Sequence, residues 1–266
     1  MRSIRKAAVL AALMVCACAA TARADERKFT YSYEAKTLPK GSWEFEQWAT
    51  LETGKKEGSW DRLNLREEIE YGITDRLTTA VYLNSRYQAN SGVPGFDDEH
   101  HFGFESMSSE WKYKLSDPSA DVVGSLLYGE LSFSNHEYEI EAKLVLSKNV
   151  GPFTFAYNFI YEAEVEEEAD ESPVWRWEHL VSNTLGVSYA FSERFAVGVE
   201  AMDVFRTMPL EAEKTHAYFV GPNVHYSSGS WWATLTVLRQ VSINGLELED
   251  SGNTEWQFRL IFGVNF

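Results

Sequence analysis

The last eleven residues, Trp256-Gln257-Phe258-Arg259-Leu260-Ile261-Phe262-Gly263-Val264-Asn265-Phe266, decide the predicted fold. Every second side chain of this stretch is apolar, and the side chains between them include Gln257, Arg259 and Asn265. Successive side chains of a β-strand point to opposite faces of the sheet, so the stretch predicts a strand with one apolar face and one mixed face.

The same two-faced pattern recurs along the chain and predicts twelve strands. They cover residues 42–52, 60–71, 75–87, 102–115, 121–133, 136–146, 153–162, 180–191, 195–206, 217–227, 231–240 and 255–266. A tilted strand of about 9–11 residues crosses a bilayer, and a closed single-chain barrel with both ends on one side needs an even number of strands. The predicted fold class is therefore all-β, a closed antiparallel transmembrane β-barrel of about 12 strands over residues 41–266.

Connector lengths support this topology because short and long connectors alternate. The short ones are residues 72–75, 116–120, 147–152, 192–194 and 228–230, and the longer ones are 53–59, 85–101, 163–179, 207–216 and 241–254. Residues 134–135 form one short connector where a long one is expected. Membrane barrels have short periplasmic turns and long outer loops, which predicts that both ends of the chain are periplasmic.

The N-terminus predicts a secretory signal peptide over residues 1–24. A basic start precedes an apolar run over residues 7–20, which is too short to span a bilayer as a helix. Ala22 and Ala24 frame the small-x-small cleavage site, and residues 25–40 are expected to form a short periplasmic lead-in. Both cysteines, Cys16 and Cys18, lie inside the signal peptide, so the mature chain has no cysteine if cleavage follows Ala24. A lipid-modified Cys18 is the alternative.

Charge and hydropathy exclude some function classes. Removing residues 1–24 takes away four basic residues and no acid, so the 24 basic residues become 20 against 40 acidic ones, a net charge of −20. This balance argues against nucleic acid as a partner. Mean hydropathy is −0.32, and no run after residue 24 predicts a membrane helix. Membrane barrels share this property because only alternate residues meet lipid.

Aromatic side chains near the segment ends predict the interfacial girdles of a membrane barrel. They are Trp43, Trp60, Tyr71, Trp111, Tyr161, Phe191, Phe195, Trp231, Trp232 and Trp256. Simple β-propensity is the alternative explanation, but it would give no bias toward segment ends.

These features resemble Gram-negative outer-membrane β-barrels. The outward set of the last strand, Phe258, Leu260, Phe262, Val264 and Phe266, resembles their C-terminal assembly signal. Residues 36–48 resemble the opening of an uncharacterised family of predicted outer-membrane proteins. The mature chain is loosely similar to barrels associated with aromatic-compound degradation, which are proposed to move hydrophobic substrates. The resemblance implies outer-membrane localisation, with outer-membrane lipid, lipopolysaccharide and the barrel-assembly machinery as partners.

The polar faces of the strands predict a charged lumen. The expected lining residues are Glu44, Glu46, Arg62, Arg66, Glu68, Glu70, Arg76, Arg86, Glu139, Glu141, Glu200 and Arg259. Charges at such positions must face water or each other, because exposure to lipid costs several kcal/mol. The predicted function is a passive channel for a small cationic or hydrophobic solute, with this lining setting selectivity. The alternative is a salt-bridged, filled interior in a structural or surface-interaction barrel.

Three further motifs suggest other chemistry. The acidic run over residues 162–171 could bind divalent cations at the outer surface, or be a solvated loop, and residues 97–101 carry metal-ligand types without a second cluster. His225 and Ser227 share a strand face and resemble the His-x-Ser pair of outer-membrane lipid A deacylases. The residue types His179, Ser182 and Asn183 resemble those of the outer-membrane phospholipase at the wrong spacing. We expect neither catalysis, nor a cofactor, nor a metal site, and a lipid-modifying hydrolase is the second alternative.

Overall fold

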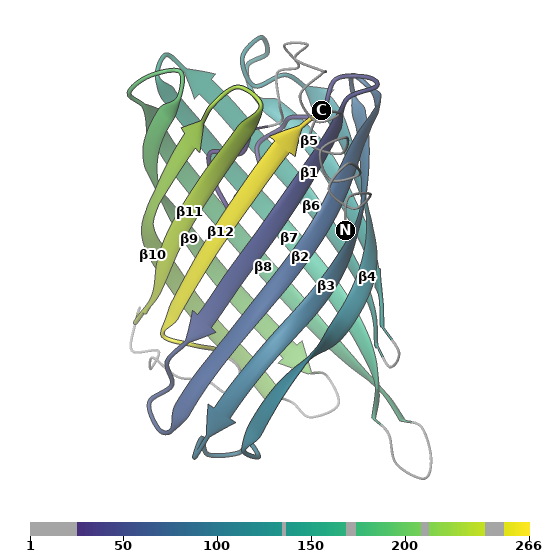
Figure 1. The fold of residues 1–266 in the computed structure, drawn as a ribbon, viewed down its shortest axis with the longest axis vertical. Helices are drawn as coiled ribbons and strands as arrows, with labels where there is room; N and C mark the ends of the chain where they lie inside the picture. The colour runs from purple at the N-terminus through teal and green to yellow at the C-terminus, as the bar shows by residue number, and fades with distance from the viewer. Residues whose placement is uncertain (1–25, 135–136, 169–173, 209–212, 243–252) are drawn as a thin grey trace, which may run out of the picture.

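The chain folds into one closed barrel of twelve antiparallel strands (Figure 1), which confirms the predicted fold class. The computed structural model describes residues 26–134, 137–168, 174–208, 213–242 and 253–266. The strands are β1 (Trp43–Thr53), β2 (Ser59–Thr74), β3 (Leu77–Ser91), β4 (Glu99–Ser116), β5 (Gly124–Phe133), β6 (Glu137–Val150), β7 (Phe153–Glu168), β8 (Val174–Ala190), β9 (Phe195–Met208), β10 (Glu213–Ser227), β11 (Trp231–Val241) and β12 (Trp256–Asn265). Among the described residues, no helix is long and apolar enough to cross a bilayer.

Each strand pairs with its neighbours in sequence, and β12 returns to β1 to close the barrel. At this seam the backbone N–H of Trp43 donates to the carbonyl of Phe266 at 3.2 Å, and the N–H of Phe266 donates to the carbonyl of Trp43 at 3.0 Å. Closure leaves no strand edge with unpaired backbone groups, which is the condition for a sheet to lie in hydrocarbon.

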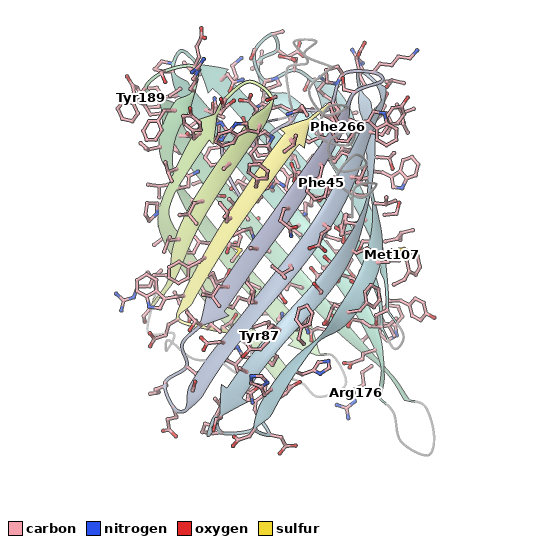
Figure 2. All side chains as sticks on the ribbon, viewed as in Figure 1. Phe45, Tyr87, Met107, Arg176, Tyr189 and Phe266 are labelled. Atoms are coloured by element: carbon pink, nitrogen blue, oxygen red, sulfur yellow. The ribbon has the colours of Figure 1, made fainter. Side chains whose placement is uncertain are left out.

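The two faces of the sheet differ as the alternating pattern predicts, and side chains project from both of them (Figure 2). On β6, the outward Ile140 is 57% exposed, whereas the neighbouring Glu141 points inward. Outward aromatic side chains such as Trp43 and Trp111 lie near strand ends, where an interfacial girdle is expected. Two predicted girdle residues, Trp60 and Trp232, instead point inward and are buried, because they occupy the lumen-facing phase of β2 and β11.

The two ends of the barrel differ in their connectors. At one end, here called the turn end, the strands are joined by residues 75–76, 117–123, 151–152, 191–194 and 228–230, and β1 begins there. At the opposite loop end, several strands run further than predicted. The expected loop over residues 163–179 is mostly strand, because β7 continues to Glu168 and β8 begins at Val174. The acidic side chains Glu162 and Glu164 take inward positions on β7, so the run of acids does not end the strand.

Residues 26–40, called the inner segment below, lie inside the barrel at its turn end. The prediction of a periplasmic lead-in is therefore wrong for the described part of that stretch. Phe29, Ala35 and Leu38 have no exposed surface, and Tyr31 and Tyr33 are 6% exposed. The wide barrel leaves room for this chain, and burial of its aromatic side chains against inward-facing groups favours that position. The cleavage site at Ala22 and Ala24 lies outside the described residues.

Candidate functional site: the lumen and its inner segment

Glu200 on β9 holds the inner segment by its backbone. Its carboxylate accepts three successive backbone N–H groups, from Thr30 at 2.9 Å, Tyr31 at 2.9 Å and Ser32 at 2.8 Å. The Thr236 hydroxyl donates to the same carboxylate at 2.6 Å. Glu200 is fully buried, and hydrogen bonds to an ionised acceptor are about twice as strong as neutral ones. One side chain therefore fixes the innermost turn of the segment.

Three other wall side chains replace the backbone partners that a strand would have. Asn158 accepts the N–H of Tyr33 at 2.6 Å and donates to its carbonyl at 3.0 Å. The hydroxyls of Ser147 and Thr78 accept the N–H groups of Ala35 and Leu38, both at 2.9 Å. Buried backbone groups need partners, and these side chains supply them without a ladder.

Aromatic and cationic side chains stack where the inner segment meets the wall. The Arg27 guanidinium lies 3.8 Å from the ring centre of Tyr33 and 4.6 Å from that of Trp48 on β1. Lys143 on β6 lies 4.4 Å from the Tyr33 ring, and Tyr33 meets Tyr128 edge to face at 5.2 Å. Such cation–π contacts are strongest when water is excluded, as it is around Tyr33.

Two glycines let the inner segment approach the wall. A Cβ atom at Gly186 on β8 would lie 2.7 Å from the ring of Phe29, and one at Gly72 on β2 would lie 2.1 Å from the carbonyl oxygen of Pro39. Any larger residue at either position would displace the segment. The glycines are therefore part of the surface that receives it.

Glu34 gives the inner segment an internal ion pair. Its carboxylate lies 2.8 Å from the Lys36 ammonium and accepts the backbone N–H of Lys28 at 2.9 Å. Burial alone would raise the pKa of Glu34, but the positive charges of Lys36 and Lys28 outweigh it, so the pKa lies below its ordinary value. The carboxylate is therefore ionised at neutral pH and supports the docked segment.

Strand register assembles the inward acids into a spiral that is interrupted on β3, where its two rows carry Ala80 and Tyr82. The first row of paired positions begins with Glu44 on β1, which faces Glu70 on β2. It continues through Ala80 on β3 and Glu110 on β4 to Glu130 on β5. From there it reaches Glu141 on β6 and Glu162 on β7. A second set runs alongside and consists of Glu46, Glu68, Glu139, Glu164 and Glu178. Adjacent strands lie about 4.8 Å apart, so this acidic spiral rises around the wall from the turn end to the loop end.

Lysines flank the acidic spiral on its turn-end side. Lys112 lies 2.7 Å from Glu70 and 3.0 Å from Glu110, and Lys143 lies 2.6 Å from Glu141. Tyr128 on β5 lies between the two lysines, because it pairs with Lys112 on β4 and with Lys143 on β6. These lysines neutralise part of the spiral and hold its carboxylates in place.

A cavity of about 410 Å³ occupies the lumen on the loop-end side of the inner segment. Tyr31 and Tyr33 lie at its inner-segment side. Most acids of its wall come from β5, β6 and β7, and the arginines come mainly from β2, β3 and β12. Glu52 on β1 and Glu105 on β4 also line it and pair with Arg62 and Arg86. Since β6 and β12 lie opposite each other in the ring of twelve strands, opposite charges face each other across the cavity.

The predicted lining residues are mostly found on the inner wall. Inward positions hold Glu44, Glu46, Arg62, Arg66, Glu68, Glu70, Arg86, Glu139, Glu141, Glu200 and Arg259. Arg76 is not among them, because it is exposed on the turn before β3. Glu200 points inward but is covered by the inner segment, so it cannot meet a solute while the segment is docked. The sequence prediction missed Glu110, Glu130, Glu162, Lys112 and Lys143, which alternation alone would have placed inward.

The residues suggested for other chemistry have structural partners. The Ser227 hydroxyl donates to Glu26 at 2.6 Å, and His225 Nδ1 lies 2.8 Å from the Thr234 hydroxyl, so both side chains contact the docked segment or the wall beside it. His100 lies 3.0 Å from the Tyr87 hydroxyl on the outer surface. His179 and Asn183 lie on the outward phase of β8, whereas Ser182 faces the lumen.

Residues 21–266 match a family model described as a family of unknown function, DUF6662. The chain belongs to this family. Its structure is similar to the crystal structure of the COG4313 outer membrane channel from Pseudomonas putida F1, with 13% identity, a TM-score of 0.60 and coverage of 90% of this chain and 100% of the other.

LpxR from Salmonella typhimurium shows a more distant likeness, with 9% identity, a TM-score of 0.47 and coverage of 84% of this chain and 99% of the other. The translocator domain of NalP from Neisseria meningitidis shows 10% identity, a TM-score of 0.48 and coverage of 85% of this chain and 87% of the other. No curated protein matches the chain. The fold is that of an outer-membrane barrel, and the apolar outer face fits that location.

Proposed function

We propose that the barrel is a narrow channel for small cations and that the inner segment closes its turn end. The observation that carries this proposal is the acidic spiral, which runs from Glu178 near the loop end to Glu44 at the turn end. From β4 to β8, carboxylates on neighbouring strands, about 4.8 Å apart, offer a cation successive sites of similar chemistry. Conduction needs such sites to be numerous and individually weak.

The charged lining favours a cationic solute over a hydrophobic one. Glu139 and Glu162 line the cavity from β6 and β7, and Arg62 and Arg206 also reach it. An apolar solute would separate these charges from water without replacing their interactions, which is unfavourable. A cation instead gains attraction from the acidic wall and is repelled by the arginines opposite, so it is guided along the spiral.

The inner segment divides the lumen into two parts. The acidic spiral faces the cavity in the loop half, but near the turn end its carboxylates lie under the segment, and Glu44 and Glu70 are at most 2% exposed. A cation can therefore enter from the loop end and reach Glu130 and Glu162 while the segment is docked. Passage through the turn end requires the segment to move.

Current through single barrels in planar bilayers tests the proposal. The mature chain should show small cation-selective currents, and deletion of residues 26–40 should increase the conductance severalfold. Replacing Glu139 and Glu162 by Gln should shift the reversal potential in a KCl gradient toward that of an unselective pore. Glu193→Gln, which removes one acid from an exposed turn, is the matched control and should change nothing. No current from the deletion variant at any salt concentration would favour the structural-barrel alternative.

A further inference from the structure

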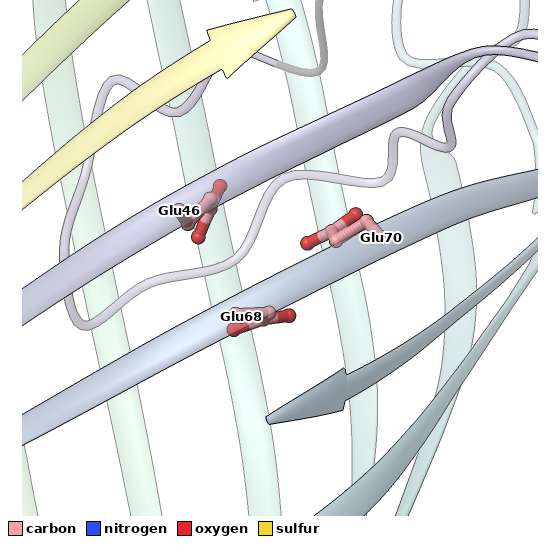
Figure 3. Close-up of side chains that lie close together, drawn as sticks. All are labelled: Glu46, Glu68 and Glu70. Atoms are coloured by element: carbon pink, nitrogen blue, oxygen red, sulfur yellow. The ribbon is translucent and has the colours of Figure 1, made fainter. Parts of the chain in front are cut away.

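Three carboxylates converge at the turn end of the acidic spiral. Glu46 faces Glu68 across the β1–β2 pair, and Glu70 follows Glu68 on the same face of β2. One oxygen from each of the three lies within 4.8 Å of the other two. The side chains project from β1 and β2 at the same place (Figure 3), and each is at most 2% exposed.

Glu68 is the member of the cluster whose buried charge is not compensated by a hydrogen-bond donor from the described part of the chain. It is 1% exposed, and neither of its carboxylate oxygens has a hydrogen-bond partner among the residues that the structure describes. Each of the other two carboxylates accepts a hydrogen bond: Glu46 from the Trp48 indole N–H at 2.6 Å, and Glu70 from the Lys112 ammonium at 2.7 Å. A buried carboxylate without a partner costs several kcal/mol, so Glu68 needs either a proton or a cation.

The charges around the cluster favour a bound cation. The carboxylates of this pocket are Glu44, Glu46, Glu68, Glu70 and Glu110. The cationic groups that act on them are Arg27, Arg66, Lys112 and, at Glu110, Lys143. Acids outnumber bases among these groups, in a region closed to bulk water by the inner segment. A bound cation would therefore reduce the repulsion between the three converging carboxylates.

We infer that Glu46, Glu68 and Glu70 form a binding site for a divalent cation of the calcium class. All the converging donors are carboxylate oxygens, which suit hard cations, and sulfur and imidazole donors are absent from this described cluster. Oxygens on opposite sides of Ca²⁺ lie at most about 5 Å apart, twice its bond length of about 2.3–2.6 Å, so the cluster accepts Ca²⁺ with little movement. Binding at this site does not require that the barrel conduct.

Calorimetric titration of the purified mature barrel, stripped with a chelator and held in detergent micelles, tests the site. The mature chain should bind one Ca²⁺ tightly and Mg²⁺ more weakly, and Ca²⁺ should raise its melting temperature by mass action. Glu68→Gln should weaken Ca²⁺ binding about tenfold or more, since ligand charge sets affinity at such sites. Glu193→Gln, which removes an acid from an exposed turn, should leave this binding unchanged.

Terbium luminescence gives a readout that does not depend on a folded Glu68 variant. Tb³⁺ at the site would be excited through the Trp48 indole, so Trp48→Phe should lower the emission while Ca²⁺ still displaces Tb³⁺ from it. Absence of Ca²⁺ heat and of any Ca²⁺-dependent melting shift in the mature chain would overturn the inference. So would an infrared band from a protonated carboxyl that Glu68→Gln removes, because Glu68 would then hold a proton.

Discussion

Replacing Glu200 by alanine should release the inner segment while leaving the barrel folded. The carboxylate accepts the backbone N–H groups of Thr30, Tyr31 and Ser32, and a hydrogen bond to a charged group contributes about 1.5–3 kcal/mol. This value is already net of the hydrogen bonds that the N–H groups make to water after undocking. Three bonds at its lower bound therefore give an expected loss of about 4 kcal/mol of docking free energy. The strand pairing of β9 does not depend on this side chain.

Backbone hydrogen exchange measures the loss directly, because exchange of a docked amide reports the free energy of local opening. A loss of about 4 kcal/mol accelerates exchange at Thr30, Tyr31 and Ser32 by about a thousandfold. Glu200→Gln, which keeps one acceptor oxygen and the shape, should give a smaller acceleration. The control is Glu162→Ala, which removes an inward acid elsewhere on the wall. Unchanged protection in Glu200→Ala, or equal loss in the control, would refute the reasoning.

Three further perturbations act on the same docked state, each read by exchange of residues 26–40. Gly186→Ala should weaken docking by about 1–3 kcal/mol, because its Cβ atom would lie 2.7 Å from the Phe29 ring; unchanged protection would mean that the ring moves without cost. Asn158→Leu removes both bonds to the Tyr33 backbone and should cost about 2–4 kcal/mol, with faster proteolysis of the segment as the second sign. Because the pKa of Glu34 is lowered by docking, its ionised carboxylate stabilises the docked state at pH values above its unfolded pKa of about 4.3. This stabilisation is lost as the pH falls through the folded pKa. Protection, corrected for intrinsic rates, should therefore stay level from about pH 8 to 5 and fall at pH values below about 4.3.

The barrel could be predicted from sequence because a period of two assigns every side chain to lipid or lumen. The Phe153–Tyr161 stretch illustrates this, since its alternate aromatic residues are outward and Thr154 and Asn158 are inward. Strand ends were harder to predict. Charges usually mark loops, but an inward glutamate in a wide polar lumen is compatible with a strand, so β7 extends through the acidic run to Glu168.

The candidate site could be predicted only in part, because it depends on register. Alternation places Glu70, Glu110 and Glu141 on the inner wall, but their common row follows from how turns and bulges set the offset of each strand. The inner segment carries a sequence signal of its own, the alternating Phe29, Tyr31 and Tyr33. That signal predicts burial of one face, but it does not reveal that side chains of distant strands would take the backbone hydrogen bonds.

The inner segment and the acidic spiral are electrostatically coupled, and this coupling determines what opening must involve. Docking places Arg27 among Glu46, Glu68 and Glu110. Burial lowers the pKa of Arg27, but Tyr33 and these three carboxylates outweigh it and raise the pKa. When the segment leaves, those carboxylates lose a fixed cation and gain contact with water and dissolved ions. The open state is therefore stabilised by the same cations that the spiral would conduct. A segment held by apolar contacts alone would close the lumen equally well, but it would not respond to the ions at the loop end.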